Sequence, residues 1–182
     1  MNAWFVRNFA NTGPKTHPFR EGFINDRLGM ELIIVMVGRT DRGFVSEGMS
    51  HYLDRLSRDV KVTPIIVAEE VHGPLERRRL LESERILSHV GSGDRLVALD
   101  ERGDELDSPG LASFLGTWRD SGVRRVVLAI GGSYGLAPQV RERADRILAL
   151  SRLTFPHQLV RVVLAEQLYR AMSILKGSKY HH

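Results

Sequence analysis

The chain has 182 residues, 42% hydrophobic and 26% charged, which is the size and composition of one soluble globular domain. It contains no cysteine, which excludes disulfides, thiolate metal sites and cysteine nucleophiles, and no apolar run approaches the roughly 18 to 20 residues of a membrane span. The net charge of +4 permits a polyanionic partner such as a nucleic acid, although many basic proteins bind none.

Residues 1–29 differ in character from the rest of the chain. They lack the apolar core of a secretory signal, and Gly13, Pro14 and Pro18 interrupt any amphipathic targeting helix. We expect an N-terminal extension, disordered or loosely docked, followed by a single domain over residues 30–182.

The first half of that domain alternates strand and helix patterns. In chain order the predicted elements are a strand over 32–37, a helix over 44–56, a strand over 62–67 and a charged helix over 75–90. Pro64 cannot donate a hydrogen bond to a neighbouring strand, so it indicates either that the second strand lies at an edge of the sheet or that Pro64 stands at the start of the strand.

The second half continues the alternation. The predicted elements are a strand over 95–99, a turn region over 100–107, a helix over 108–120, a strand over 125–130, a helix over 138–145, a short strand over 147–150 and a helix from 156 to 175. Ser108 is the expected N-cap, with Pro109 at the first helical position. The run over 126–130 is apolar at every position, which indicates burial on both faces. The alternation predicts an α/β domain with a mainly parallel sheet.

A glycine-rich segment, Gly131-Gly132-Ser133-Tyr134-Gly135, directly follows the most apolar strand. Glycines at the carboxyl end of a parallel strand allow a ligand to approach the backbone closely. The spacing is not G-x-G-x-x-G and no Walker lysine follows, so neither a dinucleotide nor a nucleoside triphosphate is indicated. A plain tight turn explains the glycines equally well.

The last predicted helix is apolar around most of its circumference and follows an unusually apolar loop over 150–155. Such a helix is buried on several sides, either in the core or between two subunits. Glu166 and Arg170 stand at i and i+4, the spacing of a simple helix ion pair. Beyond the helix, Tyr180 lies among basic residues, an arrangement suited to stacking an RNA base, although terminal histidines are also typical of a tag remnant.

Six stretches match one family pattern: Leu153-Thr154-Phe155-Pro156-His157-Gln158, the Tyr180-His181 ending, and residues 32–38, 98–103, 129–135 and 161–171. Together they resemble the SPOUT class of methyltransferases. More narrowly, they resemble the bacterial ribosomal RNA large-subunit methyltransferase H family, which methylates N3 of a pseudouridine in helix 69 of 23S rRNA. The resemblance extends from about Met30 to the last residue.

The resemblance implies an α/β SPOUT fold, with a mainly parallel sheet, helices on both faces and a C-terminal deep trefoil knot. It also implies a cytoplasmic homodimer that acts on the ribosome, uses S-adenosylmethionine and needs no metal. By position, the family's cofactor contacts fall on Leu99, Gly131, Leu150, Ser151, Arg152, Leu153, Thr154 and Phe155.

The same resemblance suggests catalytic and RNA-binding residues. Arg170, alone or with Arg161, is suited to stabilise negative charge on the base, Tyr180 to stack on the base or position it, and neutral His181 to take the imide proton. The expected RNA contacts are Arg161, His157 and Lys179, although a structural role at the helix start fits His157 equally well. Lys179 stands where many members have Pro, and residues 1–29 precede the usual family start.

Three alternatives remain open on the sequence. They are a SPOUT methyltransferase acting on another RNA position, a non-catalytic ribosome-binding module, and, disfavoured by the glycine spacing, a nicotinamide-dependent Rossmann enzyme. The Arg77-Arg78-Arg79 run fits either an RNA phosphate contact or a solvated helix face.

Overall fold

Five strands, each parallel to its neighbours, form the central sheet of the computed structural model, which describes residues 29–178. The strands are β1 (Glu31–Val37), β2 (Lys61–Val67), β3 (Arg95–Glu105), β4 (Arg125–Ile130) and β5 (Arg146–Ala149), in the order β2-β1-β4-β3-β5. Ile34 of β1 lies opposite Pro64 of β2 and Leu128 of β4. The sequence predictions of a parallel sheet and of an edge position for the strand that contains Pro64 are therefore confirmed.

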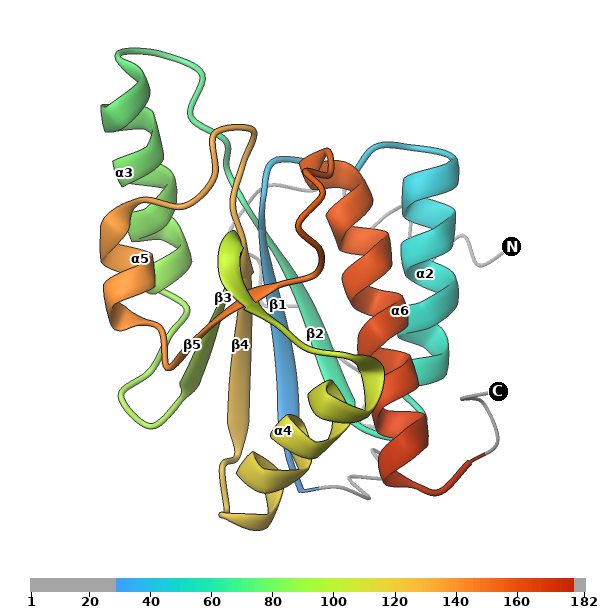
Figure 1. Cartoon of the computed structure of the whole chain (residues 1–182). Coiled ribbons are helices and arrows are strands. Elements are labelled where there is room, and N and C mark those ends of the chain that lie inside the picture. Colours follow the sequence, from blue (N-terminus) through green and yellow to red (C-terminus); the bar gives the residue numbers. More distant parts are fainter. Residues whose placement is uncertain (1–28, 179–182) are drawn as a thin grey trace, which may run out of the picture.

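Helices cover both faces of this sheet (Figure 1). They are α2 (Phe44–Leu56), α3 (Leu75–Leu87), α4 (Ser108–Asp120), α5 (Pro138–Arg143) and α6 (His157–Leu175). Helices α2, α4 and α6 pack on one face, whereas α3 and α5 pack on the other. The predicted α/β fold with helices on both faces is confirmed, and the trefoil knot stays a prediction.

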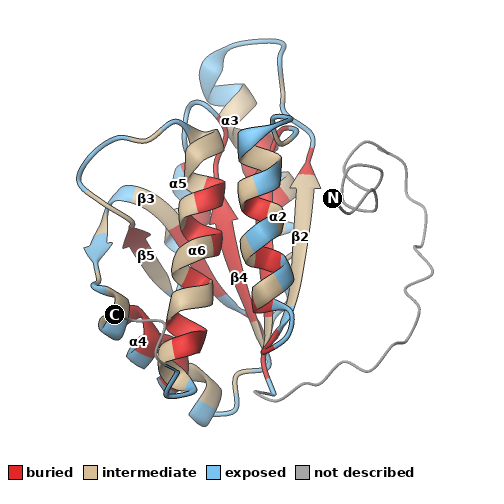
Figure 2. Ribbon diagram, turned by 90° about the vertical axis from the view of Figure 1, so that its right-hand side faces the viewer, coloured by how far each residue is buried: buried red, intermediate tan, exposed pale blue. Residues whose placement is uncertain are grey.

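Alternation along the central strands divides the core into two layers. In β1, Leu32, Ile34 and Met36 join the cluster under α2, α4 and α6, whereas Ile33 and Val35 join the cluster under α3 and α5. Strand β4 behaves in the same way and is buried beyond its first residue (Figure 2). Because both faces of these strands are covered, an uninterrupted apolar run is required there.

Strand β3 is longer than the sequence predicted. The prediction ended it at Leu99, but after an irregularity in register Asp104 pairs with Leu148 and Glu105 pairs with Ala149. A Cβ atom on Gly103 would lie 2.6 Å from the carbonyl carbon of Ile147, so the close approach of β5 requires glycine. The last residues of β3 are held in the sheet by backbone pairing with β5. Their sequence is polar and lacks the apolar alternation by which a strand is predicted.

Smaller differences occur at the helix ends. Asp107, not Ser108, is the N-cap of α4, and its Oδ1 accepts a hydrogen bond of 2.7 Å from the Gly110 amide. Helices α3 and α5 end two to three residues earlier than predicted, where caps and turns are hard to place from sequence. Within residues 29–178, no helix combines the length and the apolar character that crossing a membrane requires.

Candidate functional site

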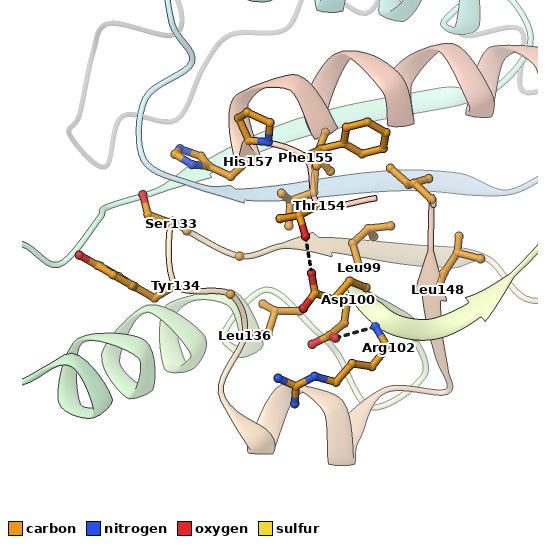
Figure 3. Close-up of a pocket in the computed structure, with 18 of the residues that line it drawn as sticks. Leu99, Asp100, Arg102, Ser133, Tyr134, Leu136, Leu148, Thr154, Phe155 and His157 are labelled. Carbon is orange, nitrogen blue, oxygen red and sulfur yellow. Dashed lines mark hydrogen bonds between the residues drawn. The ribbon is translucent and has the colours of Figure 1, made fainter. Parts of the chain in front are cut away.

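A pocket of about 790 Å³ lies where β4 and β5 end, beside the register irregularity of β3 (Figure 3). Its walls come from residues 99–102 of β3, the loop over 130–136 and the segment over 150–157, with Arg79 of α3 and Arg141 of α5 completing them. This is the size of a small-molecule site, and the carboxyl ends of parallel strands are where α/β proteins bind their ligands.

The glycine-rich segment forms a tight turn in the pocket wall. The Gly135 amide donates a hydrogen bond of 3.0 Å to the Gly132 carbonyl, and Gly135 has a φ of +73°. A Cβ atom on Gly131 would lie 2.7 Å from the Gly135 carbonyl carbon, and one on Gly132 would lie 2.9 Å from Oε2 of Glu82. The segment is therefore the tight turn that one sequence alternative named, and the turn lines the pocket.

Helices α3 and α5 fasten this turn through Arg79 and Arg141, which also line the pocket, and through Ser83. The Leu136 carbonyl accepts hydrogen bonds of 2.9 Å from both Arg79 Nη2 and Arg141 Nη1. The Ala137 amide donates to Oγ of Ser83, 3.0 Å away. Arg79 and Ser83 lie more than fifty residues before this loop, so local sequence patterns could not have linked them to it.

Two carboxylates supply negative charge in the middle of β3, at its register irregularity. Asp100 accepts from Arg141 Nη1 at 3.2 Å and from the Arg102 amide at 3.0 Å. Glu101 accepts from Oγ1 of Thr154 at 3.1 Å, which joins β3 to the segment before α6 (Figure 3). Their position directly after the predicted strand over 95–99 was the sequence signal for both, although neither was predicted as a site residue.

Seven of the eight residues predicted to contact the cofactor line this one pocket. They are Leu99, Gly131, Leu150, Ser151, Leu153, Thr154 and Phe155. Ile130 and Leu148 extend the apolar part of the wall. The exception is Arg152, whose Nε instead lies 2.9 Å from Oε2 of Glu105 and whose side chain is largely exposed.

His157, at the start of α6, also lines the pocket. Its partial burial and the nearby positive charge of Arg161 lower the pKa of its imidazole, an effect that Glu69 and Asp41 oppose. His157 is therefore neutral near pH 7 and able to accept a proton. Its ring lies 3.3 Å from Nε2 of Gln158.

Arg161 does not occupy a surface position, contrary to the prediction that it contacts RNA. It is 1% exposed, and its Nη2 donates to the Val37 carbonyl at 2.5 Å. Its Nη1 donates to the Gly38 carbonyl at 3.1 Å and to Oγ1 of Thr40 at 2.8 Å. Burial lowers its pKa to about 10. The guanidinium fastens the end of β1 to α6, so the predicted RNA contact is corrected to a structural role.

Arg170 pairs with Glu166, as one sequence alternative suggested. Its Nε and Nη2 lie 2.9 and 2.6 Å from Oε1 of Glu166. At roughly 1.5 Å per residue, Arg170 is about 20 Å along α6 from His157, and it does not line the pocket. Lys179, Tyr180 and His181, the other predicted tail residues, lie outside the described residues.

The arginine run of α3 divides between two environments. Arg77 is exposed, whereas Arg78 donates from Nε to the Glu70 carbonyl at 2.6 Å and Arg79 reaches the pocket wall. Arg77 therefore lies on a solvated helix face, as one alternative held, whereas Arg78 and Arg79 also make hydrogen bonds within the protein.

The parallel α/β sheet and the pocket at its carboxyl edge define an α/β domain of the class in which cofactor-dependent enzymes bind their ligands at this edge. The family model described as "Predicted SPOUT methyltransferase" matches residues 30–181. A protein named ribosomal RNA large subunit methyltransferase H, from Geobacter metallireducens, is 51% identical over 156 residues, which cover 84% of this chain and 99% of that relative.

Proteins of the same name from Trichlorobacter lovleyi and Geobacter sulfurreducens are 44% and 43% identical over 153 residues, covering 84% of this chain and all of each relative. The chain therefore belongs to the SPOUT methyltransferases and, within them, to the ribosomal RNA large subunit methyltransferase H family.

Proposed function

We propose that this protein transfers a methyl group from S-adenosylmethionine to large-subunit ribosomal RNA, at N3 of a pseudouridine in helix 69 of the assembled ribosome. One observation carries the proposal: seven residues expected to contact the cofactor, from three separate segments, converge on a single pocket in a member of this family. The names of the relatives support methylation of large-subunit rRNA. The target atom and the helix follow from the family resemblance, and a ribosomal substrate would place the protein in the cytoplasm.

The pocket has the chemistry to hold this cofactor. Leu99, Leu150 and Phe155 offer apolar surface for an adenosine group, and the glycine turn lets that group approach the backbone. Asp100 and Glu101 can balance the positive charge of the sulfonium and ammonium groups. When bound, S-adenosylmethionine supplies an already activated methyl group, so the chain has chiefly to orient donor and acceptor.

Methylation at N3 requires that the imide proton of the base leave, and two histidines are candidates to accept it. His181 belongs to the tail that the resemblance assigns to the active site. His157 lines the pocket, and its lowered pKa keeps it unprotonated at neutral pH. Arginine stays protonated and is excluded as the base, whereas it can stabilise charge that develops on the carbonyl oxygens.

Arg170 can serve that purpose only in a dimer, because it lies about 20 Å along α6 from the pocket edge of its own chain. We therefore propose that Arg170 acts at the pocket of the partner subunit in a homodimer. The packing of α6 supports a second subunit, since its apolar Leu159 and Val163 are only partly buried in the described chain. Sedimentation equilibrium that shows a monomer at micromolar concentration would remove both the dimer and this role.

The proposal is tested by incubating the full chain with tritiated S-adenosylmethionine and ribosomes that lack the modification, followed by single-turnover kinetics of variants. We expect His181→Ala to slow methyl transfer at least tenfold and Tyr180→Leu, which removes the stacking face, to slow it measurably, with His182→Ala as the matched control. If His181→Ala and Tyr180→Leu both transfer at the normal rate, the catalytic role of the tail is wrong and His157→Ala becomes the decisive variant.

The non-catalytic alternative is separated by calorimetry. A ribosome-binding module has no reason to bind S-adenosylmethionine, whereas the proposed enzyme must bind it without RNA present. Saturable binding that is lost in Gly131→Ala would support the enzyme, and no detectable binding by the native chain would favour the module.

A further inference from the structure

Tyr134 is an aromatic side chain at the edge of the pocket that the proposed chemistry does not use. It is 49% exposed, although it is a large aromatic residue next to the candidate site. It lies at the opposite end of the pocket from Leu148, and its ring is directed away from the apolar wall (Figure 3). An exposed aromatic residue beside a binding site is a candidate contact for a ligand.

The backbone holds Tyr134 in place at the tip of a turn. Ser133 and Tyr134 are the central residues of the turn closed by the bond from the Gly135 amide to the Gly132 carbonyl. Beyond the turn, Arg79 and Ser83 of α3 fix residues 136 and 137. Little conformational freedom remains to be lost when a ligand contacts the ring, which favours binding.

Arg78 adds a positive charge beside the Tyr134 ring. We call this pair of side chains the platform. Its guanidinium carbon lies 5.1 Å from the centroid of the Tyr134 ring, in a cation–π arrangement. The bond from its Nε to the Glu70 carbonyl, 2.6 Å long, fixes the guanidinium, and Glu70 is itself held by a bond of 2.9 Å from its amide to Glu82 Oε1. The aromatic ring and the cation are therefore positioned together before any ligand arrives.

We propose that Tyr134, supported by Arg78, stacks on a base of the substrate RNA next to the nucleotide that is methylated. This inference rests on the proposed function and names part of its RNA-binding surface. The aromatic ring can stack on a nucleobase, and the positive guanidinium beside it can attract the phosphate backbone to which that base is joined. The other possible occupant is the adenine of the cofactor, for which the apolar residues at the far end of the pocket, among them Leu99 and Leu148, are the better environment.

The test compares Tyr134→Leu, Tyr134→Phe and Tyr134→Trp in methyl transfer to ribosomes that lack the modification. Loss of one stacked base predicts a rise of roughly tenfold in the KM for ribosomes in Tyr134→Leu. Tyr134→Phe and Tyr134→Trp keep a stacking face and are expected to stay within about threefold of the native chain. Calorimetric affinity for S-adenosylmethionine alone is expected to be unchanged in all three. Phe44→Leu, the same kind of change at the exposed aromatic residue that begins α2, is the matched control and should alter nothing.

Two results would overturn the platform while leaving the proposed function intact. One is a normal KM for ribosomes in Tyr134→Leu, and the other is weakened cofactor binding in that variant, which would assign the ring to adenine. A native chain that binds S-adenosylmethionine but methylates no ribosome would instead refute the proposed function and the platform with it. Thermal unfolding of each variant shows whether the fold is kept.

Discussion

Replacing Arg161 tests whether this arginine is a structural tie or an RNA contact. Its guanidinium is buried and donates to the Val37 and Gly38 carbonyls and to Thr40. Gln158, one turn away, holds the same loop, donating to the Arg39 carbonyl at 2.8 Å and accepting from the Asp41 amide at 3.1 Å. Removing the guanidinium should therefore loosen the loop that follows β1 and affect RNA only indirectly.

Two effects of opposite sign set the size of the change in stability. Leaving the Val37 and Gly38 carbonyls without this donor costs about 1 to 3 kcal/mol each. Against this, the fall in pKa of Arg161 to about 10 corresponds to about 3 kcal/mol of unfavourable charge burial, which any neutral residue relieves. We expect Arg161→Met, which keeps most of the volume, to lower the free energy of unfolding by about 1 kcal/mol. Arg161→Ala also creates a cavity, so we expect a loss of about 3 to 5 kcal/mol.

The assay is guanidinium chloride denaturation at one fixed protein concentration, because dimerisation makes apparent stability depend on concentration. Hydrogen exchange of residues 39–43 reports on the loop itself, and both variants should exchange faster there. A structural role for Arg161 is excluded if Arg161→Met keeps native stability and native exchange in this loop while its affinity for ribosomes falls tenfold, because Arg161 would then reach the RNA.

Three further predictions concern the pocket and its supports. In Gly131→Ala the new Cβ would lie 2.7 Å from the Gly135 backbone, so we expect calorimetry to show S-adenosylmethionine binding weakened at least tenfold. In Gly135→Ala the new Cβ would meet no atom within 4 Å. That variant should mainly lose about 1 kcal/mol of unfolding free energy, because residue 135 has a φ of +73°. Burial raises the pKa of Glu82, so its ionised form opposes folding at neutral pH. Glu82→Gln should therefore stabilise the protein at pH 7, and denaturation should show this advantage shrinking as pH falls towards 4.5. Asp107→Ala should lower the unfolding free energy by about 1 kcal/mol in denaturant titration, through loss of the α4 cap, and no change would mean the cap is not formed in solution.

The sequence predicted the elements of the fold well where their pattern was apolar. The strands that begin near Leu32 and Arg125 and the helix from Phe44 to Leu56 were placed within a residue, because burial dictates their periodicity. The end of β3 was missed because Asp104 and Glu105 are held by β5, a partner more than forty residues away in the sequence. Pairing between residues so far apart cannot be predicted from the local sequence pattern.

The site was predictable only in part, for the same reason. The resemblance identified seven residues of the pocket wall, but no local pattern joined Arg79 or Ser83 to the segment after the glycine turn, more than fifty residues later. Arg161 appeared to be a cation available to RNA, because the carbonyls that bury it lie more than 120 residues earlier. A charge on a helix can be assigned to surface or core only once its distant partners are known.

The proposed function is tested most directly by nucleoside mass spectrometry of 23S rRNA after incubating the native chain and S-adenosylmethionine with ribosomes that lack the modification. We predict one added methyl group, found as N3-methylpseudouridine in the fragment that contains helix 69. A methyl group at any other nucleotide would contradict the proposed target, and ribosomes with no added methyl group would contradict the proposed enzyme.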